Sequence, residues 1–175
     1  MKRFLIVVLL FFIALDGFSQ INRTIWGVTL GKSTKQQVRT VLIEKGYNVD
    51  IDPDGSLAVR VYNVVFGGAH WTYISFSFVN GYLSNITFQN NEQQSPVRIE
   101  NTYEKLKESL NKKYSFYRLS LPGADDDGHV LTCYSDGKTS LVLDLSYFRS
   151  RRYISLFYED EELQLKKRQN AEDEL

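Results

Sequence analysis

Four residues near the start of the chain, Gly31-Lys32-Ser33-Thr34, match the end of a nucleotide-binding phosphate loop. Such a loop needs another glycine five positions earlier, because its backbone N–H groups must wrap around a phosphate. That position holds Trp26, and Gly27 leaves only three intervening residues. We therefore expect no nucleotide site. Ser33, with Gln36 three residues later, instead predicts a capping box that begins a helix.

Three aspartates at alternate positions, Asp50, Asp52 and Asp54, match the first half of a calcium-binding loop. Carboxylates at this spacing can point at one ion, and Gly55 allows the sharp turn. The twelfth position of the loop holds Val61, where a bidentate glutamate is needed. The segment therefore predicts a polar turn between a helix and a strand. A calcium site that takes further ligands from elsewhere is the alternative, and no other cofactor is indicated.

Residues suited to nucleophilic catalysis are few: His70, His129 and the single cysteine, Cys133. His129 and Cys133 lie four apart in one predicted strand, about 13 Å from each other, which is too far for a thiolate pair. The sequence shows no serine–histidine–aspartate arrangement, no zinc-ligand spacing and no glycine-rich cofactor loop. We therefore expect no enzymatic activity, and we expect Cys133 to be a small buried residue.

Aromatic residues are frequent in the predicted strands. Some must face outward, because isoleucine, leucine and phenylalanine already supply the inner faces. We expect Trp71, Tyr73, Tyr82 and Tyr153 on such an outer binding surface. Exposed aromatic rows suit the binding of a protein or a glycan. A second layer that covers them, either the helices or a dimer partner, is the alternative.

The start of the chain resembles an export signal. Basic residues at positions 2 and 3 precede an apolar run over 4–15, and small residues follow at 17 and 19. The run is shorter than the ~20 residues that cross a bilayer, so a signal peptide cleaved after residue 19 is expected. This predicts a periplasmic or secreted protein without a stable membrane anchor. The remaining chain has 19 basic and 20 acidic residues, a balance that argues against nucleic-acid binding.

The elements that position these residues follow one plan twice. A short strand over 23–29 leads to a helix over 34–45, whose apolar stripe is Val38, Val41 and Leu42. Strands are then expected over 57–66, 71–79 and 82–89. Asn80-Gly81 predicts a two-residue hairpin between the last two.

The second round begins at Ser95, a predicted N-cap, with Pro96 at the first helical position. The apolar face of this helix comprises Ile99, Tyr103, Leu106, Leu110 and Tyr114. Strands are expected over 115–121, 129–134, 140–148 and 153–158. Residues 160–175 form a charged tail, either a helical extension or a frayed end.

Segments 72–78 and 82–88 correspond to 141–147 and 153–159 at an offset of 69 to 71 residues. The predicted fold class is therefore α+β with an internal duplication. Two tandem units are expected over 20–92 and 93–159. Each is a helix packed on an antiparallel meander of three to four strands.

The stretch Trp-Gly-Val-Thr-Leu-Gly-Lys-Ser-Thr-Lys-Gln-Gln-Val-(x3)-Leu-(x3)-Gly, from Trp26 to Gly46, resembles the helix entry of small exported domains. These are related to the outer-membrane assembly lipoprotein BamE and to the beta-lactamase inhibitory protein (BLIP), which itself contains two tandem helix-plus-sheet units. The resemblance implies a binding module without catalysis. The chain lacks the lipid-anchoring cysteine of the first family and the disulfides of the second, so neither partner is implied.

Taken together, these patterns predict a non-catalytic binding module of the bacterial cell envelope. Its partner is a protein or another envelope component, and nucleic acid is excluded. The alternative is a calcium-stabilised domain, or one that binds a small ligand or glycan, which uses the Asp50–Asp54 loop and the sheet aromatics.

Overall fold

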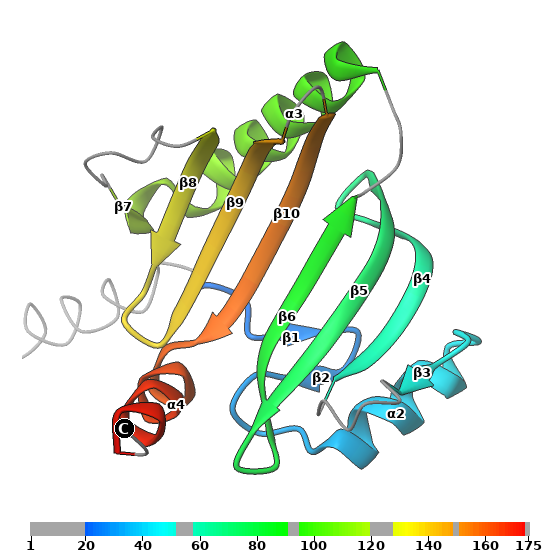
Figure 1. The fold of residues 1–175 in the computed structure, drawn as a ribbon, viewed down its shortest axis with the longest axis vertical. Coiled ribbons are helices and arrows are strands. Elements are labelled where there is room, and N and C mark those ends of the chain that lie inside the picture. The colour runs from blue at the N-terminus through cyan, green and yellow to red at the C-terminus, as the bar shows by residue number, and fades with distance from the viewer. Residues whose placement is uncertain (1–19, 52–57, 91–94, 120–127, 149–150, 174–175) are drawn as a thin grey trace, which may run out of the picture.

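A computed structural model describes residues 20–51, 58–90, 95–119, 128–148 and 151–173. Within these ranges the fold is α+β, as predicted: a large antiparallel sheet, a small hairpin and three α-helices (Figure 1). The helices are α2 (Lys35–Glu44), α3 (Pro96–Tyr114) and α4 (Glu161–Asp173). The strands are β1 (Thr24–Ile25), β2 (Val28–Thr29), β3 (Asp50–Ile51), β4 (Val59–Phe66), β5 (Ala69–Val79), β6 (Tyr82–Asn90), β7 (Arg118–Leu119), β8 (His129–Ser135), β9 (Thr139–Phe148) and β10 (Arg151–Asp160).

All strands from β3 onward belong to one eight-stranded sheet, in the order β3-β4-β5-β6-β10-β9-β8-β7. The two expected meanders are therefore not separate sheets, because β6 and β10 pair at the centre, with Thr87 opposite Phe157. Two local predictions were wrong. The strand expected over 23–29 is the hairpin β1–β2, and the strand expected over 115–121 begins as a 3-10 turn, Ser115–Tyr117.

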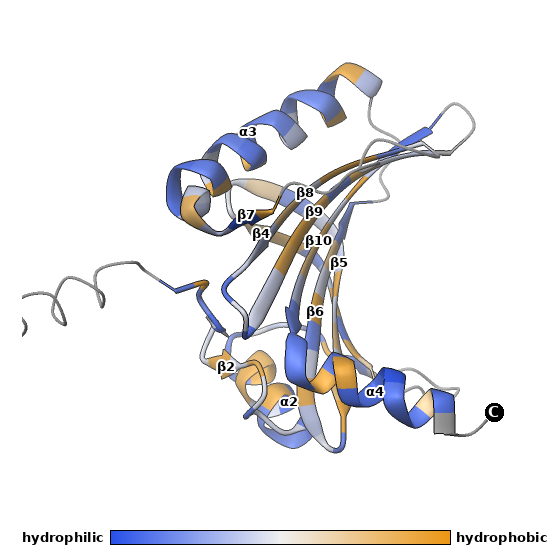
Figure 2. Cartoon of the chain, turned by 90° about the vertical axis from the view of Figure 1, so that its left-hand side faces the viewer, coloured by the Kyte–Doolittle hydropathy of each residue, from blue (hydrophilic) through white to orange (hydrophobic). Residues whose placement is uncertain are grey.

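The core lies between the sheet and two helices, α2 and α3, which both lie on one side of it (Figure 2). Ser95 caps α3 and Pro96 occupies its first turn, as predicted. The buried face of α3 is also the predicted one: Ile99, Tyr103, Leu106, Leu110 and Tyr114. The shorter α2 buries Val38 and Leu42. Helix α4, in the segment expected to be a charged tail, follows β10 and lies at one end of the opposite side (Figure 2).

The alternation of β4 and β5 slips by one residue within the strands. Val61 and Ile74 are paired and buried, and the next buried pair is Val64 and Trp71, three residues away in each strand. Asn63, between them, adopts a left-handed conformation with φ +54°. The slip keeps apolar side chains on the helix side of the sheet despite the irregular spacing.

Candidate binding face

The Gly-Lys-Ser-Thr segment is explained by folding. Gly31 has φ +74°, and a Cβ there would overlap the Asp160 carboxylate and lie 2.7 Å from Arg23 Nη2. Arg23 and Asp160 form an ion pair, with Asp160 only 4% exposed. Glycine is therefore needed for the close approach of the chain to this pair.

The cap of α2 lies one residue later than predicted. Thr34, rather than Ser33, is the N-cap, and its hydroxyl accepts from the Gln37 backbone N–H at 3.4 Å. Gln37 Oε1 completes the capping box by accepting from the Thr34 N–H at 2.9 Å. The Ser33 hydroxyl instead accepts from the Thr29 backbone N–H at 2.9 Å. It therefore closes the turn that leads out of β2.

The calcium alternative has one of its three carboxylates in the described chain. Asp50 lies in β3, where its Oδ2 accepts a hydrogen bond from the Tyr62 hydroxyl at 3.3 Å. Asp52 and Asp54 lie outside the described residues, as does the predicted signal peptide. Among the residues that the structure describes, no group of three His, Cys, Asp or Glu is placed to hold a metal ion.

The sulfur of Cys133 is buried, as predicted. Burial, and then the neighbouring Asp144 carboxylate, raise the pKa of the Cys133 thiol above its usual value of 9.0. A raised pKa keeps the thiol protonated at neutral pH and disfavours a nucleophilic thiolate. Asp144 also contacts the ring of His129, with 3.1 Å between His129 Nδ1 and Asp144 Oδ1.

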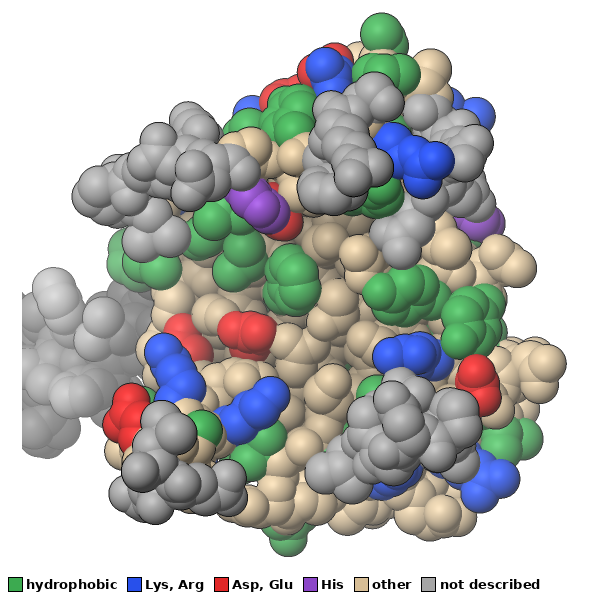
Figure 3. Space-filling view, viewed as in Figure 1, with side chains coloured by type: hydrophobic (Ala, Val, Ile, Leu, Met, Phe, Trp, Pro, Cys, Tyr) green, Lys and Arg blue, Asp and Glu red, His purple; other side chains and the backbone are tan. Residues whose placement is uncertain are grey.

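Among the described residues, no helix covers the middle of the second side of the sheet (Figure 1), and the side chains of this side face the viewer in Figure 3. We call it the open face and define it by two adjacent rows of cross-strand neighbours, with Tyr153 beyond the second. The first row is Asp50, Arg60, Ser75, Thr87, Phe157, Val142, Cys133 and Leu119. The second row is Tyr62, Tyr73, Gln89, Ser155, Asp144 and Leu131.

The sheet is curved at the open face. The strands bend so that this face lies on the inner side of the bend (Figure 2). Ser155 and Asp144, at the centre of the second row, are 5% and 8% exposed although no helix covers them. A ligand on this face would contact a curved surface.

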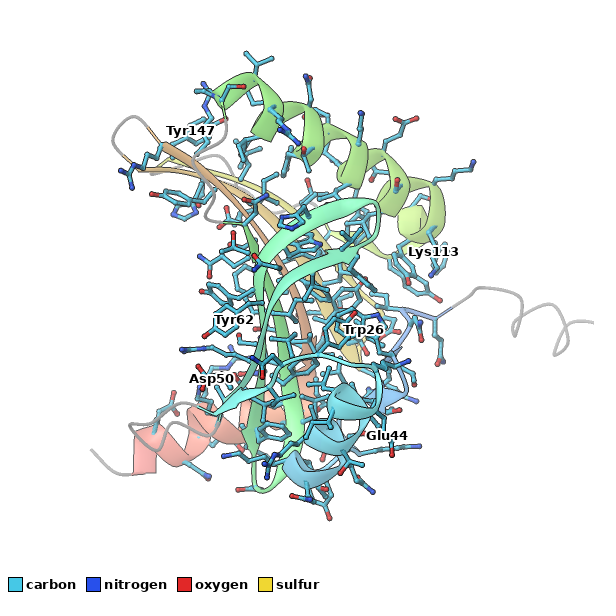
Figure 4. All side chains as sticks on the ribbon, turned by 90° about the vertical axis from the view of Figure 1, so that its right-hand side faces the viewer. Trp26, Glu44, Asp50, Tyr62, Lys113 and Tyr147 are labelled. Carbon is cyan, nitrogen blue, oxygen red and sulfur yellow. The ribbon has the colours of Figure 1, made fainter. Side chains whose placement is uncertain are left out.

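The two halves of the open face differ in chemistry. Towards β7, the first row is apolar: Phe157, Val142, Cys133 and Leu119. Towards β3, both rows are polar or aromatic, and the rings of Tyr62 and Tyr73 lie 6.4 Å apart. Figure 4 shows Tyr62 and Asp50 on the open face of the sheet and Trp26 on its helix side.

Polar side chains of the open face are held by one another. Tyr73 donates its hydroxyl hydrogen bond to Gln89 Oε1. Asn85, in the row beyond Thr87, donates from Nδ2 to Glu159 Oε1 at 2.7 Å and accepts from the Thr87 hydroxyl at 2.6 Å. These contacts fix the side chains before a ligand arrives, which lowers the entropy cost of binding.

Of the four predicted surface aromatics, the structure brings two together. Tyr73 and Tyr153 lie on the open face, with one strand, β6, between them and an offset of two residues along β10. Trp71 does not belong to a surface: it is 1% exposed in the core, because of the slip at Asn63. Tyr82 is 47% exposed, but it lies about 23 Å along β6 from the residue opposite Tyr73.

Sequence reasoning left two residues of this face, Tyr62 and Phe157, out of the predicted set. Tyr62 is 44% exposed on β4, and Phe157 is half-buried at the middle of the first row. Their signal was the alternation with Val61 on β4 and with Leu156 and Tyr158 on β10. Strand phase would have found both residues.

Comparisons with protein-family models, with curated proteins and with solved structures find no significant match for this chain. In the part of the chain that the structure describes, none of the helices combines the length and the apolar character that a membrane span requires.

Proposed function

We propose that the protein is an exported, non-catalytic binding module that binds another protein on its open face. The observation that carries this proposal is the curved row of Phe157, Val142 and Leu119 with the Tyr62–Tyr73 pair beside it, on a sheet whose other face already has a complete core. A core behind the sheet stabilises the fold without these residues.

The chemistry of the open face favours a protein over a small ligand. Protein interfaces combine an apolar centre, aromatic anchors and a polar rim. The open face has all three, since Phe157 and Val142 lie at its middle, the Tyr62–Tyr73 pair lies towards β3, and Asp50 and Glu159 lie at its margins. A protein loop or edge could follow the bend across several strands.

Export and duplication are part of the same proposal. The apolar run over 4–15 supports a cleaved signal peptide, and hence a periplasmic or secreted location. The pairing of β6 with β10 supports a tandem origin, because these two strands contain the corresponding segments 82–88 and 153–159 and lie side by side at the centre of the sheet. The resemblance to BamE-like and BLIP-like domains agrees with a binding role.

The experiment is site-specific photocrosslinking in the native cell envelope. A photoreactive side chain at Tyr62, 44% exposed on the open face, is compared with one at Ile43, 52% exposed on α2. We expect one saturable protein adduct from position 62 and none from position 43. Affinity for the purified adduct partner is then measured with Tyr73→Ala and Phe157→Ala, and each should weaken binding at least tenfold.

Three outcomes would contradict the proposal. Equal adducts from positions 62 and 43 would indicate non-specific capture. Unchanged affinity in both alanine variants would place the interface elsewhere. If a chelator abolishes binding of the partner and the alanine variants do not, the Asp50–Asp54 calcium loop would be favoured.

A further inference from the structure

A second surface depression lies on the opposite side of the molecule, between α3 and the β4–β5 turn. It is a groove of about 730 Å³ with Gly67, Gly68 and Ala69 along one wall. The other wall is one face of α3, including Arg98, Lys105 and Lys112. We call this feature the basic groove. Because α3 packs on the helix side of the sheet, the groove and the open face are separate (Figure 2).

The cations of the basic groove are regularly spaced. Arg98, Lys105 and Lys112 follow one another at intervals of seven residues, which is about 10.5 Å along a helix. The row is therefore about 21 Å long. All three side chains are exposed, and among the described residues that line the groove Glu108 is the one acidic residue.

Two other acidic residues of α3 form ion pairs outside the basic groove. Glu104 forms an ion pair with Lys107 at 2.8 Å, and Glu100 pairs with Arg152 of β10. Neither glutamate lines the groove. The local charge of the wall is therefore positive, although the whole chain has equal numbers of acidic and basic residues.

The facing wall is shaped for a ligand that lies close to the backbone. Gly67 and Gly68 both have positive φ, +62° and +77°, as a two-residue hairpin turn requires. Neither carries a side chain, so this wall is low and the groove stays open. Hydroxyl and amide groups of Thr102 and Asn101 lie between the cations. They supply hydrogen-bonding groups along the row.

From this geometry we propose that the basic groove binds an extended polyanion, a chain-like ligand with several phosphate or sulfate groups. Cations about 10.5 Å apart match several separated charges better than one compact anion. The two walls favour a chain over a bilayer, because a flat membrane surface cannot enter between α3 and the Gly67-Gly68 turn. Occupation of both surfaces would let the protein hold its partner beside a polyanion.

The test uses inorganic polyphosphate as the probe and two variants matched in helix and charge. Lys105→Gln with Lys112→Gln removes two cations of the groove. Lys107→Gln with Lys113→Gln removes two lysines of the same helix that do not line it. Lys113 lies instead over the Tyr114 ring, 5.0 Å from its centroid (Figure 4). Circular dichroism checks that both variants fold.

We expect the groove variant to bind polyphosphate at least tenfold more weakly at low salt, and the matched variant to change less than threefold. For the groove variant, the plot of log affinity against log salt concentration should also become shallower, by about one unit of slope for each lysine removed. Equal losses of affinity in the two variants would overturn binding in the groove. They would indicate that polyphosphate responds only to the overall positive charge of α3. Absence of binding by the unaltered protein would overturn the site itself.

Two controls distinguish a polyanion site from a membrane-binding surface and from the open face. Binding to anionic phospholipid vesicles that exceeds binding to polyphosphate would overturn the chain-like ligand in favour of a membrane surface. Tyr73→Ala should leave polyphosphate binding unchanged, because the open face lies on the other side of the sheet. A failed proposal for the open face would therefore not affect this result.

Discussion

The two faces of the eight-stranded sheet use their aromatic residues in opposite ways. On the helix side, Trp71 and Phe88 pack with their ring centroids 5.4 Å apart and are fully buried. On the open face, Tyr62 and Tyr73 pair at 6.4 Å with one ring 44% exposed. An aromatic residue in a strand therefore has no fixed role, and the phase of the strand decides whether it stabilises the fold or is available for binding.

Trp71 and Tyr73 sharpen this comparison because they lie two residues apart in one strand. A regular strand would place both on one face. The irregularity opposite Asn63 instead turns Trp71 into the core, where its indole N–H donates to the Phe66 carbonyl at 3.0 Å. Tyr73 remains on the open face.

The largest expected effect follows from this pair. Trp71→Ala should lower the free energy of unfolding by about 3–5 kcal/mol, because it leaves a cavity and removes the packing on Phe88. Tyr73→Ala should cost about 1 kcal/mol or less, since a partly exposed side chain loses little buried area. Urea denaturation followed by fluorescence measures both values. Equal losses would mean that the two faces are equally part of the core.

A second large effect is expected at Gly31, on the margin of the covered face. Gly31→Ala should cost about 2–4 kcal/mol, since alanine at φ +74° is strained and its Cβ would displace the partly buried Arg23–Asp160 pair. Lys32→Ala, the neighbouring residue, is the control and should change stability by less than about 0.5 kcal/mol. A mild effect of Gly31→Ala would show that the ion pair moves freely.

Much of the covered face could be predicted from sequence, since periodicity reports burial directly. The apolar face of α3 matched residue by residue, from Ile99 to Tyr114. The cap of α2 was wrong by one position, because Ser33 and Thr34 each have a suitable partner three residues on, Gln36 and Gln37. Only the backbone of the turn out of β2 distinguishes them.

The open face was harder to predict for two physical reasons. Its rows combine residues from strands far apart in sequence, such as Thr87 and Phe157, and no local pattern specifies that β6 pairs with β10. The slip that buries Trp71 depends on the left-handed conformation of Asn63, a choice that the strand pattern conceals. The surface could be anticipated as aromatic, but Trp71 could not be excluded from it.

Two buried tyrosines on the helix side should make stability depend on pH. Burial on the helix side raises the pKa of Tyr134 to about 12, from 10.0, and burial raises the pKa of Tyr158 too. The unfolded chain therefore loses these protons at lower pH than the folded chain does. Stability should fall as pH rises from 10 towards 12, by up to about 1.4 kcal/mol per pH unit for each group.

Tyr134→Phe isolates one of these groups. The variant should lose about 1 kcal/mol near neutral pH, because the hydroxyl of Tyr134 donates to Asn111 Oδ1 at 2.9 Å. Above pH 10 its stability should fall less steeply than that of the unaltered protein. Parallel curves, measured by urea denaturation across pH 9 to 11.5, would show that Tyr134 titrates alike in the folded and unfolded states.

The smallest expected effect is a gain. Thr139 is fully buried, and among the described residues its Oγ1 has no hydrogen-bond partner. Thr139→Val keeps the shape and the β-branch and removes a hydroxyl that lost its water on folding, so stability should rise by about 1 kcal/mol. Thr132→Val is the matched control on the same side of the sheet, because Thr132 Oγ1 shares a hydrogen bond of 2.9 Å with the Tyr103 hydroxyl. That variant should lose about 1–2 kcal/mol. Opposite signs at these two threonines would show that the covered face tolerates polar atoms only where they are paired, whereas a loss at both would mean that the Thr139 hydroxyl is satisfied in solution.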